Sequence, residues 1–297
     1  MIATAEVEAA LKAARERDLN LEGIEMFLGL EDLRDGTVAE EQGKEFAELL
    51  AGYLAALGTV AGEPEVDRLA QALELLAANH FEIPVHNHLR VVNYHNCTRA
   101  MAGTYERQLG RLAERWDSVA EHELLDLLDG KPWVKPRAGV VPVLYEGYRN
   151  SYDVALPLVE KAGLKAWFVV PTAFVDAPVA EQAAVADRCD IVLCDEVPAD
   201  GRLAMSWDEL RDVVARGHTV ICHTAHHRGI ADLRTEEDRR RELADSRARL
   251  AEELGRPVHG LAFLWGSALG GNPDVDAAVA EAGYRFVLSN TKLQRLP

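Results

Sequence analysis

Side chains that can bind a metal or move a proton directly follow two apolar stretches of the sequence. One stretch is followed by Tyr145 and Glu146, and the other by His223 and His227. Two histidines four positions apart share a face of a helical turn, so they can chelate one ion. Two histidines with one carboxylate from another strand end are a common catalytic set that leaves a coordination position for water. The sequence therefore predicts a metal centre of Glu146, His223 and His227.

Each of these residues also has a plain structural reading. The chain contains ten histidines, so a pair with this spacing arises by chance in about a third of such sequences. Glu146 would otherwise be a water-exposed turn acid, and Tyr145 a packing residue with a wet hydroxyl. His95, which ends an earlier apolar stretch, is either part of the site or a buried histidine with satisfied nitrogens. His226 is predicted to point away from the ligands, as a surface residue or a residue behind them.

The elements that must position these side chains alternate between strands and capped helices from residue 81 onward. Ser118 and Ser206 each open a capping box, in which a glutamate three positions later returns a hydrogen bond. Strands are predicted at residues 89–95, 140–144, 166–170, 190–193, 219–222, 261–263 and 286–288. Repeated β-then-α order predicts a parallel sheet, closed as a barrel or open, with active residues at the carboxyl ends of its strands. These ends carry Tyr94, His95, Tyr145, Glu146, His223, His227 and Trp265.

The first part of the chain has a different composition. Residues 1–83 are rich in alanine, leucine and glutamate, and Thr37 opens a capping box, so helices are predicted there. We expect this helical N-terminal segment to act as a cap or as a dimerisation element that makes a homodimer. Residues 84–297 are expected to form the α/β domain that carries the site.

Composition narrows the classes of partner. The net charge of −17 argues against nucleic acid and membrane surfaces, because both need basic patches. The four cysteines include no C-x-x-C pair, and no apolar run approaches the ~20 residues of a membrane span. Acids begin at Glu6 with no signal-peptide core, so we expect a cytoplasmic location. The charged run at residues 234–243 is predicted to be a solvated helix face.

From about residue 91 to the C-terminus, the chain resembles the polysaccharide deacetylase family, carbohydrate esterase family four. Val143-Leu-Tyr-Glu-Gly147 matches the family's strand ending in Thr-Phe-Asp-Asp-Gly, and His223-Thr-Ala-His-His227 matches its His-Ser/Thr-x-x-His motif. RARLAEELGRPVHGLAFLWG resembles the approach to the family's Pro-Tyr-Gly motif, and VVNYHN resembles a Tyr-His strand of one branch. The resemblance implies a distorted, incomplete (β/α) barrel and a divalent metal, commonly zinc.

Carried over position by position, the resemblance implies a partly altered site. His223 and His227 match ligands, and Glu146 stands where the family has its ligand aspartate. Tyr145 stands where the family has its general base, although a phenol is a poor base unless its pKa is depressed. Trp265 falls in the Pro-Tyr position, where its backbone amide would stabilise an oxyanion. No clear late Leu-x-His motif is found, so His95 is the candidate proton donor.

The implied activity is that of a metal-dependent hydrolase that removes an acyl group from nitrogen. With a cytoplasmic location, the expected substrate is a small acylated molecule or an amino sugar rather than a wall polymer. Two alternatives stay open: a catalytically degenerate member that binds a ligand or partner, and a member repurposed for another metal-assisted reaction. The altered base and acid favour these alternatives, and the retained ligand set favours the hydrolase.

Overall fold

The structure is a computed structural model that describes residues 89–289 and 293–296, with the backbone alone for Gln294. All described residues belong to one compact unit, Leu89–Pro297. The helical segment predicted for residues 1–83, with its expected cap or dimer role, lies outside the described residues, as do residues 84–88.

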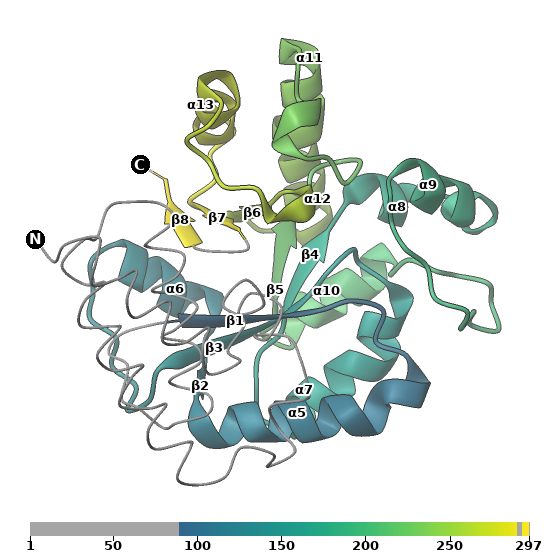
Figure 1. Cartoon of the computed structure of the whole chain (residues 1–297), viewed down its shortest axis with the longest axis vertical. Coiled ribbons are helices and arrows are strands. Elements are labelled where there is room, and N and C mark those ends of the chain that lie inside the picture. The colour runs from purple at the N-terminus through teal and green to yellow at the C-terminus, as the bar shows by residue number, and fades with distance from the viewer. Residues whose placement is uncertain (1–88, 290–292, 297) are drawn as a thin grey trace, which may run out of the picture. The chain divides into compact units, whose positions relative to one another are not determined.

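A curled eight-stranded sheet organises the described residues (Figure 1). The strand order is β1-β3-β4-β5-β6-β7-β8, with β2 paired beside β3. Pairing is parallel throughout, except that β8 runs antiparallel to β7. The strands are β1 (Leu89–Tyr94), β2 (Asp117–Ser118), β3 (Gly139–Leu144), β4 (Trp167–Val170), β5 (Thr219–Cys222), β6 (Gly260–Ala262), β7 (Phe286–Leu288) and β8 (Leu293–Arg295). Since β1 and β8 end the order, the predicted incomplete (β/α) barrel is confirmed.

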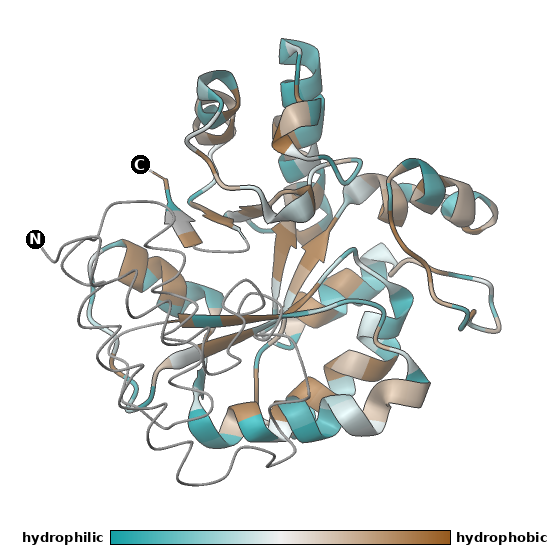
Figure 2. Cartoon of the chain, viewed as in Figure 1, coloured by the Kyte–Doolittle hydropathy of each residue, from teal (hydrophilic) through white to brown (hydrophobic). Residues whose placement is uncertain are grey.

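Helices surround the sheet on its outer side (Figure 1). They are α5 (Ala102–Arg115), α6 (Glu121–Leu128), α7 (Leu156–Lys161), α8 (Thr172–Asp176), α9 (Gln182–Arg188), α10 (Trp207–Ala215), α11 (Glu236–Arg239), α12 (Ser246–Leu254) and α13 (Pro273–Glu281). Figure 2 shows β4 and β5 hydrophobic along their length, while α5 and α10 carry hydrophilic residues on part of their surface. Among the described helices, none combines the length and apolar composition that a membrane crossing requires.

Two local predictions from the sequence are corrected by the structure. The helix expected to start at Ser118 begins at Glu121 instead, with Ala120 as the residue before it, because Ser118 pairs in β2 and its hydroxyl accepts a hydrogen bond from the Lys165 amide. The strand predicted at residues 190–193 is irregular, and its Val192 carbonyl accepts a hydrogen bond from the Tyr148 hydroxyl rather than from a neighbouring strand. The capping box at Ser206 is confirmed by reciprocal hydrogen bonds with Glu209.

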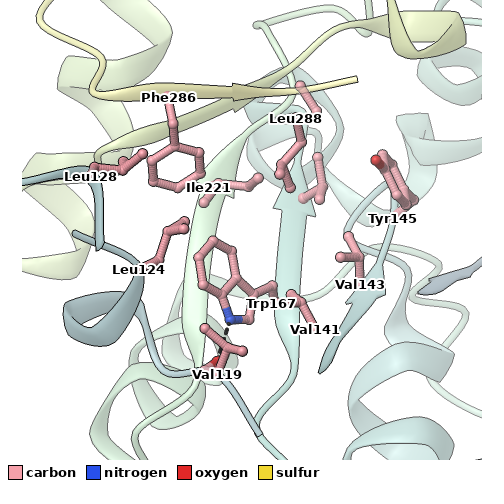
Figure 3. Close-up of a cluster of buried hydrophobic side chains, with 12 residues drawn as sticks. Val119, Leu124, Leu128, Val141, Val143, Tyr145, Trp167, Ile221, Phe286 and Leu288 are labelled. Carbon is pink, nitrogen blue, oxygen red and sulfur yellow. Dashed lines mark hydrogen bonds between the residues drawn. The ribbon is translucent and has the colours of Figure 1, made fainter. Parts of the chain in front are cut away.

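The main hydrophobic core lies against the sheet and includes one residue of the predicted site. Figure 3 shows Trp167 among the aliphatic side chains of this core, with Tyr145 at its edge. The Trp167 indole is fully buried, lies 5.6 Å from the Phe286 ring between centroids, and donates a 3.0 Å hydrogen bond to the Val119 carbonyl. Val141 and Val143 of β3 also belong to this core, which therefore fixes the strand that directly precedes Tyr145.

Close packing at Gly260 generates a stability prediction. A Cβ at this position would lie 2.5 Å from two ring carbons of Phe286 and 2.7 Å from a methyl carbon of Ile221. Gly260→Ala should lower the free energy of unfolding by about 1–3 kcal/mol, because a well-packed core resists added volume. Urea unfolding measures the change.

Gly110→Ala is the matched control, because the added Cβ meets no atom within 4 Å beyond the adjacent residues and the backbone of its own helix. Gly110 is inside α5, so the control should gain up to about 1 kcal/mol from helix propensity. A Gly260→Ala protein as stable as the wild type would contradict the packing argument.

Candidate metal centre

A sharp backbone turn after β3 places Glu146. The Tyr145 amide continues the pairing with β1 by donating to the Tyr94 carbonyl at 3.1 Å. The next residue, Glu146, has a φ of 61°, and Gly147 has a φ of 63°. The left-handed conformation is costly for a residue with a side chain and persists only where the surroundings impose it. The turn therefore ends the strand and directs the carboxylate to the carboxyl end of the sheet.

The two histidines follow β5 in a loop that also contains left-handed residues. The His223 amide donates to the Val170 carbonyl at 2.9 Å, which extends the β4–β5 pairing. Thr224 has a φ of 59° and His227 a φ of 55°. The Thr224 hydroxyl accepts a 2.7 Å hydrogen bond from the Arg228 amide. This bond closes the turn that contains His227.

Glu146, His223 and His227 converge as predicted. Each offers one ligand atom, and these atoms lie within 4.8 Å of one another. Glu146 Oε1 lies 3.5 Å from Nε2 of His227 and 3.8 Å from Nε2 of His223. All three residues are buried, with at most 4% of any of them exposed. Strands β3 and β5, which are separated in the sheet by β4, thus supply one compact set of donor atoms.

Backbone carbonyls fix which nitrogen of each imidazole faces Glu146. Nδ1 of His223 lies 2.8 Å from the Ala262 carbonyl, and Nδ1 of His227 lies 2.8 Å from the Cys189 carbonyl. A carbonyl only accepts hydrogen bonds, so each Nδ1 carries the proton. In the neutral imidazole, Nε2 then presents its lone pair toward Glu146. This is the arrangement by which proteins orient histidine ligands of metals.

The donor set fits a divalent metal. Glu146 Oε2 is buried and has no hydrogen-bond partner among the described residues. A buried charged oxygen without a partner is costly. A cation held by Glu146 and the two Nε2 atoms would satisfy that oxygen and neutralise the carboxylate. Two histidines and one carboxylate match the ligand types of catalytic zinc sites.

The electrostatics keep the ligand groups in their metal-binding forms. Burial alone would raise the pKa of Glu146, but the neighbouring imidazoles of His223, His227 and His95 outweigh it and lower the pKa, because any of them that is protonated at Nε2 stabilises the carboxylate. Burial lowers the pKa of His223, with Glu146 opposing the shift. An ionised carboxylate and a neutral imidazole are the states that bind metals.

Tyr145 and His95 lie together beside these ligands. Their rings stack with centroids 4.9 Å apart and planes 6° apart, and the Tyr145 ring also meets the His223 ring edge-on at 5.3 Å. Nε2 of His95 lies 3.4 Å from Glu146 Oε1, and 52% of the His95 side chain is exposed. Burial and then the charge of Glu146 raise the pKa of Tyr145. The protein's own groups therefore favour the neutral phenol, which opposes the predicted base role of Tyr145.

Trp265 lies in a turn after β6. It has a φ of 62°, and the neighbouring Leu264 amide donates to the Arg228 carbonyl at 3.2 Å. This bond joins the turn to the residue after His227. The Trp265 residue is 80% exposed. The oxyanion role expected for its backbone amide stays a prediction.

Three partners of the histidine loop were missed from the sequence. Two are the carbonyls of Ala262 and Cys189, which leave no side-chain signal. The third is Glu242, which is 1% exposed, so the solvated face predicted for residues 234–243 is wrong at this position. Its carboxylate binds His226, and its spacing with the buried Ser246 and Leu250 is a helical pattern that was available in the sequence.

The carboxylate of Glu146 should make the stability of the metal-free protein depend on pH. Its folded pKa lies below the ordinary glutamate value, about 4.3. It therefore contributes stability that is fully present above that value and is lost as the pH falls through the folded pKa. The advantage of the wild type over Glu146→Gln should shrink between about pH 5 and pH 2. Unfolding by urea in the presence of a chelator measures it, and an advantage that does not shrink on acidification would contradict the depressed pKa.

Comparison with known proteins identifies the domain that carries this site. The polysaccharide deacetylase family model matches residues 143–287, which include all three candidate ligands. No curated protein matches the chain significantly.

Several solved structures share the fold. The Streptococcus pyogenes deacetylase PplD, solved in complex with acetate, is 15% identical with a TM-score of 0.52, over 68% of this chain and 82% of its own. The BpsB deacetylase domain from Bordetella bronchiseptica is 17% identical with a TM-score of 0.51, over 69% of this chain and 90% of its own. A de-N-acetylase from Aggregatibacter actinomycetemcomitans is 15% identical with a TM-score of 0.50, over 67% and 86%. Residues 143–287 are therefore a domain of the polysaccharide deacetylase family.

Proposed function

We propose that the protein is a metal-dependent hydrolase that removes an acyl group from nitrogen. The observation that carries this proposal is the buried Glu146 carboxylate, whose Oε2 has no partner among the described residues, while two oriented Nε2 atoms lie within 3.8 Å of its other oxygen, Oε1. Zinc is the proposed ion, because a pair of imidazoles with one carboxylate is a zinc-type ligand set. When bound, such an ion supplies Lewis acidity that polarises an acyl carbonyl and makes water more acidic.

Two residues beside the ligands have the chemistry to assist this reaction. His95 is half-exposed and lies beside Glu146, so in its protonated form it can give a proton to a departing nitrogen. The phenol of Tyr145 is held neutral by burial, so it can donate a hydrogen bond to a developing negative charge. The backbone amide of Trp265 is proposed as a second donor to that charge. In this assignment no side chain of the protein replaces the family's base.

The substrate is proposed to be a small acylated molecule or an amino sugar, in the cytoplasm. This proposal rests on the acidic composition of the chain, with its net charge of −17. The same charge balance disfavours nucleic acid and membrane partners.

A catalytically silent member of the family is the second candidate. The observation that favours it is Tyr145, a neutral phenol at the position where the sequence predicts a base. Such a protein would keep the metal and bind a ligand without turnover. A protein repurposed for another metal-assisted reaction would keep the metal and turn over a different class of substrate.

Metal content tests the site directly. The purified wild-type protein should contain stoichiometric divalent metal by elemental analysis, and His223→Ala should contain none, because two of three ligands cannot hold the ion against washing. His122→Ala, which removes an exposed histidine from α6, is the control and should keep the metal. Absence of metal from the wild type after loading with zinc would rule out the proposed hydrolase.

Turnover tests the role of His95. With N-acetylated amino sugars and small amides as substrates, His95→Gln should lower kcat by about 10²- to 10⁴-fold, the usual contribution of a general acid. Its metal content should stay that of the wild type. His259→Gln is the control, since His259 precedes β6 at the opposite end of the sheet and contacts Glu121. Undiminished turnover in His95→Gln would exclude His95 as the acid, and absent turnover in a metal-loaded wild type would favour the silent member.

A further inference from the structure

One buried charge lies directly behind the histidine loop. Glu242 is 1% exposed, although it belongs to the charged run at residues 234–243. A carboxylate is rarely buried unless it is paired and hydrogen-bonded. The hydrogen bonds of Glu242 therefore indicate which part of the structure its buried carboxylate stabilises.

The Glu242 carboxylate contacts both the backbone and the side chain of His226. Its Oε2 accepts a 2.8 Å hydrogen bond from the His226 backbone amide, and its Oε1 lies 2.8 Å from Nδ1 of the same residue. Arg241 adds a 3.2 Å contact from Nε to Oε1. His226 precedes the proposed ligand His227, so these hydrogen bonds restrain the backbone next to that ligand.

An irregular helical segment turns Glu242 inward. Residues Arg240–Asp245 form a π-helical segment between α11 and α12. A π-segment changes the angular positions of its residues, and such segments are frequent at functional sites. Here Glu242 and Leu243 are both buried, and the Leu243 carbonyl accepts a 2.9 Å hydrogen bond from the Tyr284 hydroxyl. The helix is thereby anchored while it presents Glu242 to the loop.

The same helix also holds the other end of the ligand loop. The Ser246 hydroxyl lies 3.1 Å from Sγ of Cys222, the residue before His223. Ser246 and Glu242 are one helical turn apart, and they contact the residues that precede the two histidine ligands. Since Thr224 and His227 both have left-handed backbone conformations, the loop needs such contacts to keep its shape.

We propose that Glu242 is a positioning residue for the metal centre, which holds the histidine loop in its ligand-presenting conformation through the His226 backbone amide. This inference rests on the proposed function, in which a divalent ion binds Glu146, His223 and His227. The mechanism acts through backbone geometry, because Glu242 itself contacts His226 rather than the ligand atoms.

The test measures zinc affinity of the metal-free protein and uses variants that separate geometry from charge. Glu242→Met keeps the length of the side chain but accepts no hydrogen bond, so zinc affinity should fall by about 10- to 100-fold, as when other groups that orient ligands are lost. Glu242→Gln removes the charge but can accept from the His226 amide and donate to Nδ1 of the other tautomer. Its affinity should stay within about threefold of the wild type, a small change compared with the loss of an orienting group. Competition with a chromophoric chelator gives these affinities.

Glu237→Met is the matched control, because Glu237 is an exposed glutamate of the same helix. It should bind zinc as the wild type does. Equal losses in Glu242→Met and Glu242→Gln would show that charge matters rather than positioning, and would overturn the proposal. So would unchanged affinity in Glu242→Met.

A second readout does not depend on the metal. Long-range ¹H–¹⁵N NMR spectra of the metal-free protein report the imidazole tautomers, and the wild type should show His223 and His227 protonated at Nδ1. Glu242→Met should move the His227 signals toward a mixture of tautomers, because the loop no longer holds its Nδ1 on the Cys189 carbonyl. Wild-type tautomers in Glu242→Met would overturn the proposal. If the wild type fails to bind zinc, the proposed function is wrong, and this readout alone decides whether Glu242 positions the loop.

Discussion

The burial of one negative charge, on Glu146, is the constraint around which the site is organised. A carboxylate removed from water needs partners of opposite charge or hydrogen-bond donors, and the chain brings histidines from two other loops to its Oε1. The carbonyls of Ala262 and Cys189 in turn fix the rings of His223 and His227. Backbone carbonyls thus contact the imidazoles that contact Glu146, so the candidate site extends beyond its three proposed ligands.

Several residues around the site have energetically unfavourable backbone conformations. Glu146, Thr224, His227 and Trp265 all have positive φ values without being glycine, and all follow the carboxyl ends of β3, β5 or β6. Residues other than glycine rarely adopt the left-handed backbone conformation, which persists where surrounding contacts impose it. The turn of Trp265 bonds to the residue after His227. Contacts of this kind connect the loops to one another at one edge of the sheet.

The fold and the convergence of three candidate ligands were predictable from the sequence because they depend on patterns that the chain displays. Alternating apolar strands and capped helices predict a parallel sheet, and residues that follow such strands meet at one edge, as Glu146, His223 and His227 do. The backbone turns and carbonyl partners were not predictable, since they depend on which loops pack together. Residues 190–193 show a further limit, because an apolar run such as that around Ile191 packs into a cluster as readily as it pairs in a sheet.

The stacking of His95 on Tyr145 bears on how the His95 ring could regain a proton after donating one. The His95 ring is pinned flat against a buried phenol, while about half of its side chain faces solvent. A proton that leaves this imidazole can therefore be replaced from bulk solvent. In the proposed role of His95 as proton donor, the ring can therefore regain its proton while product is still bound.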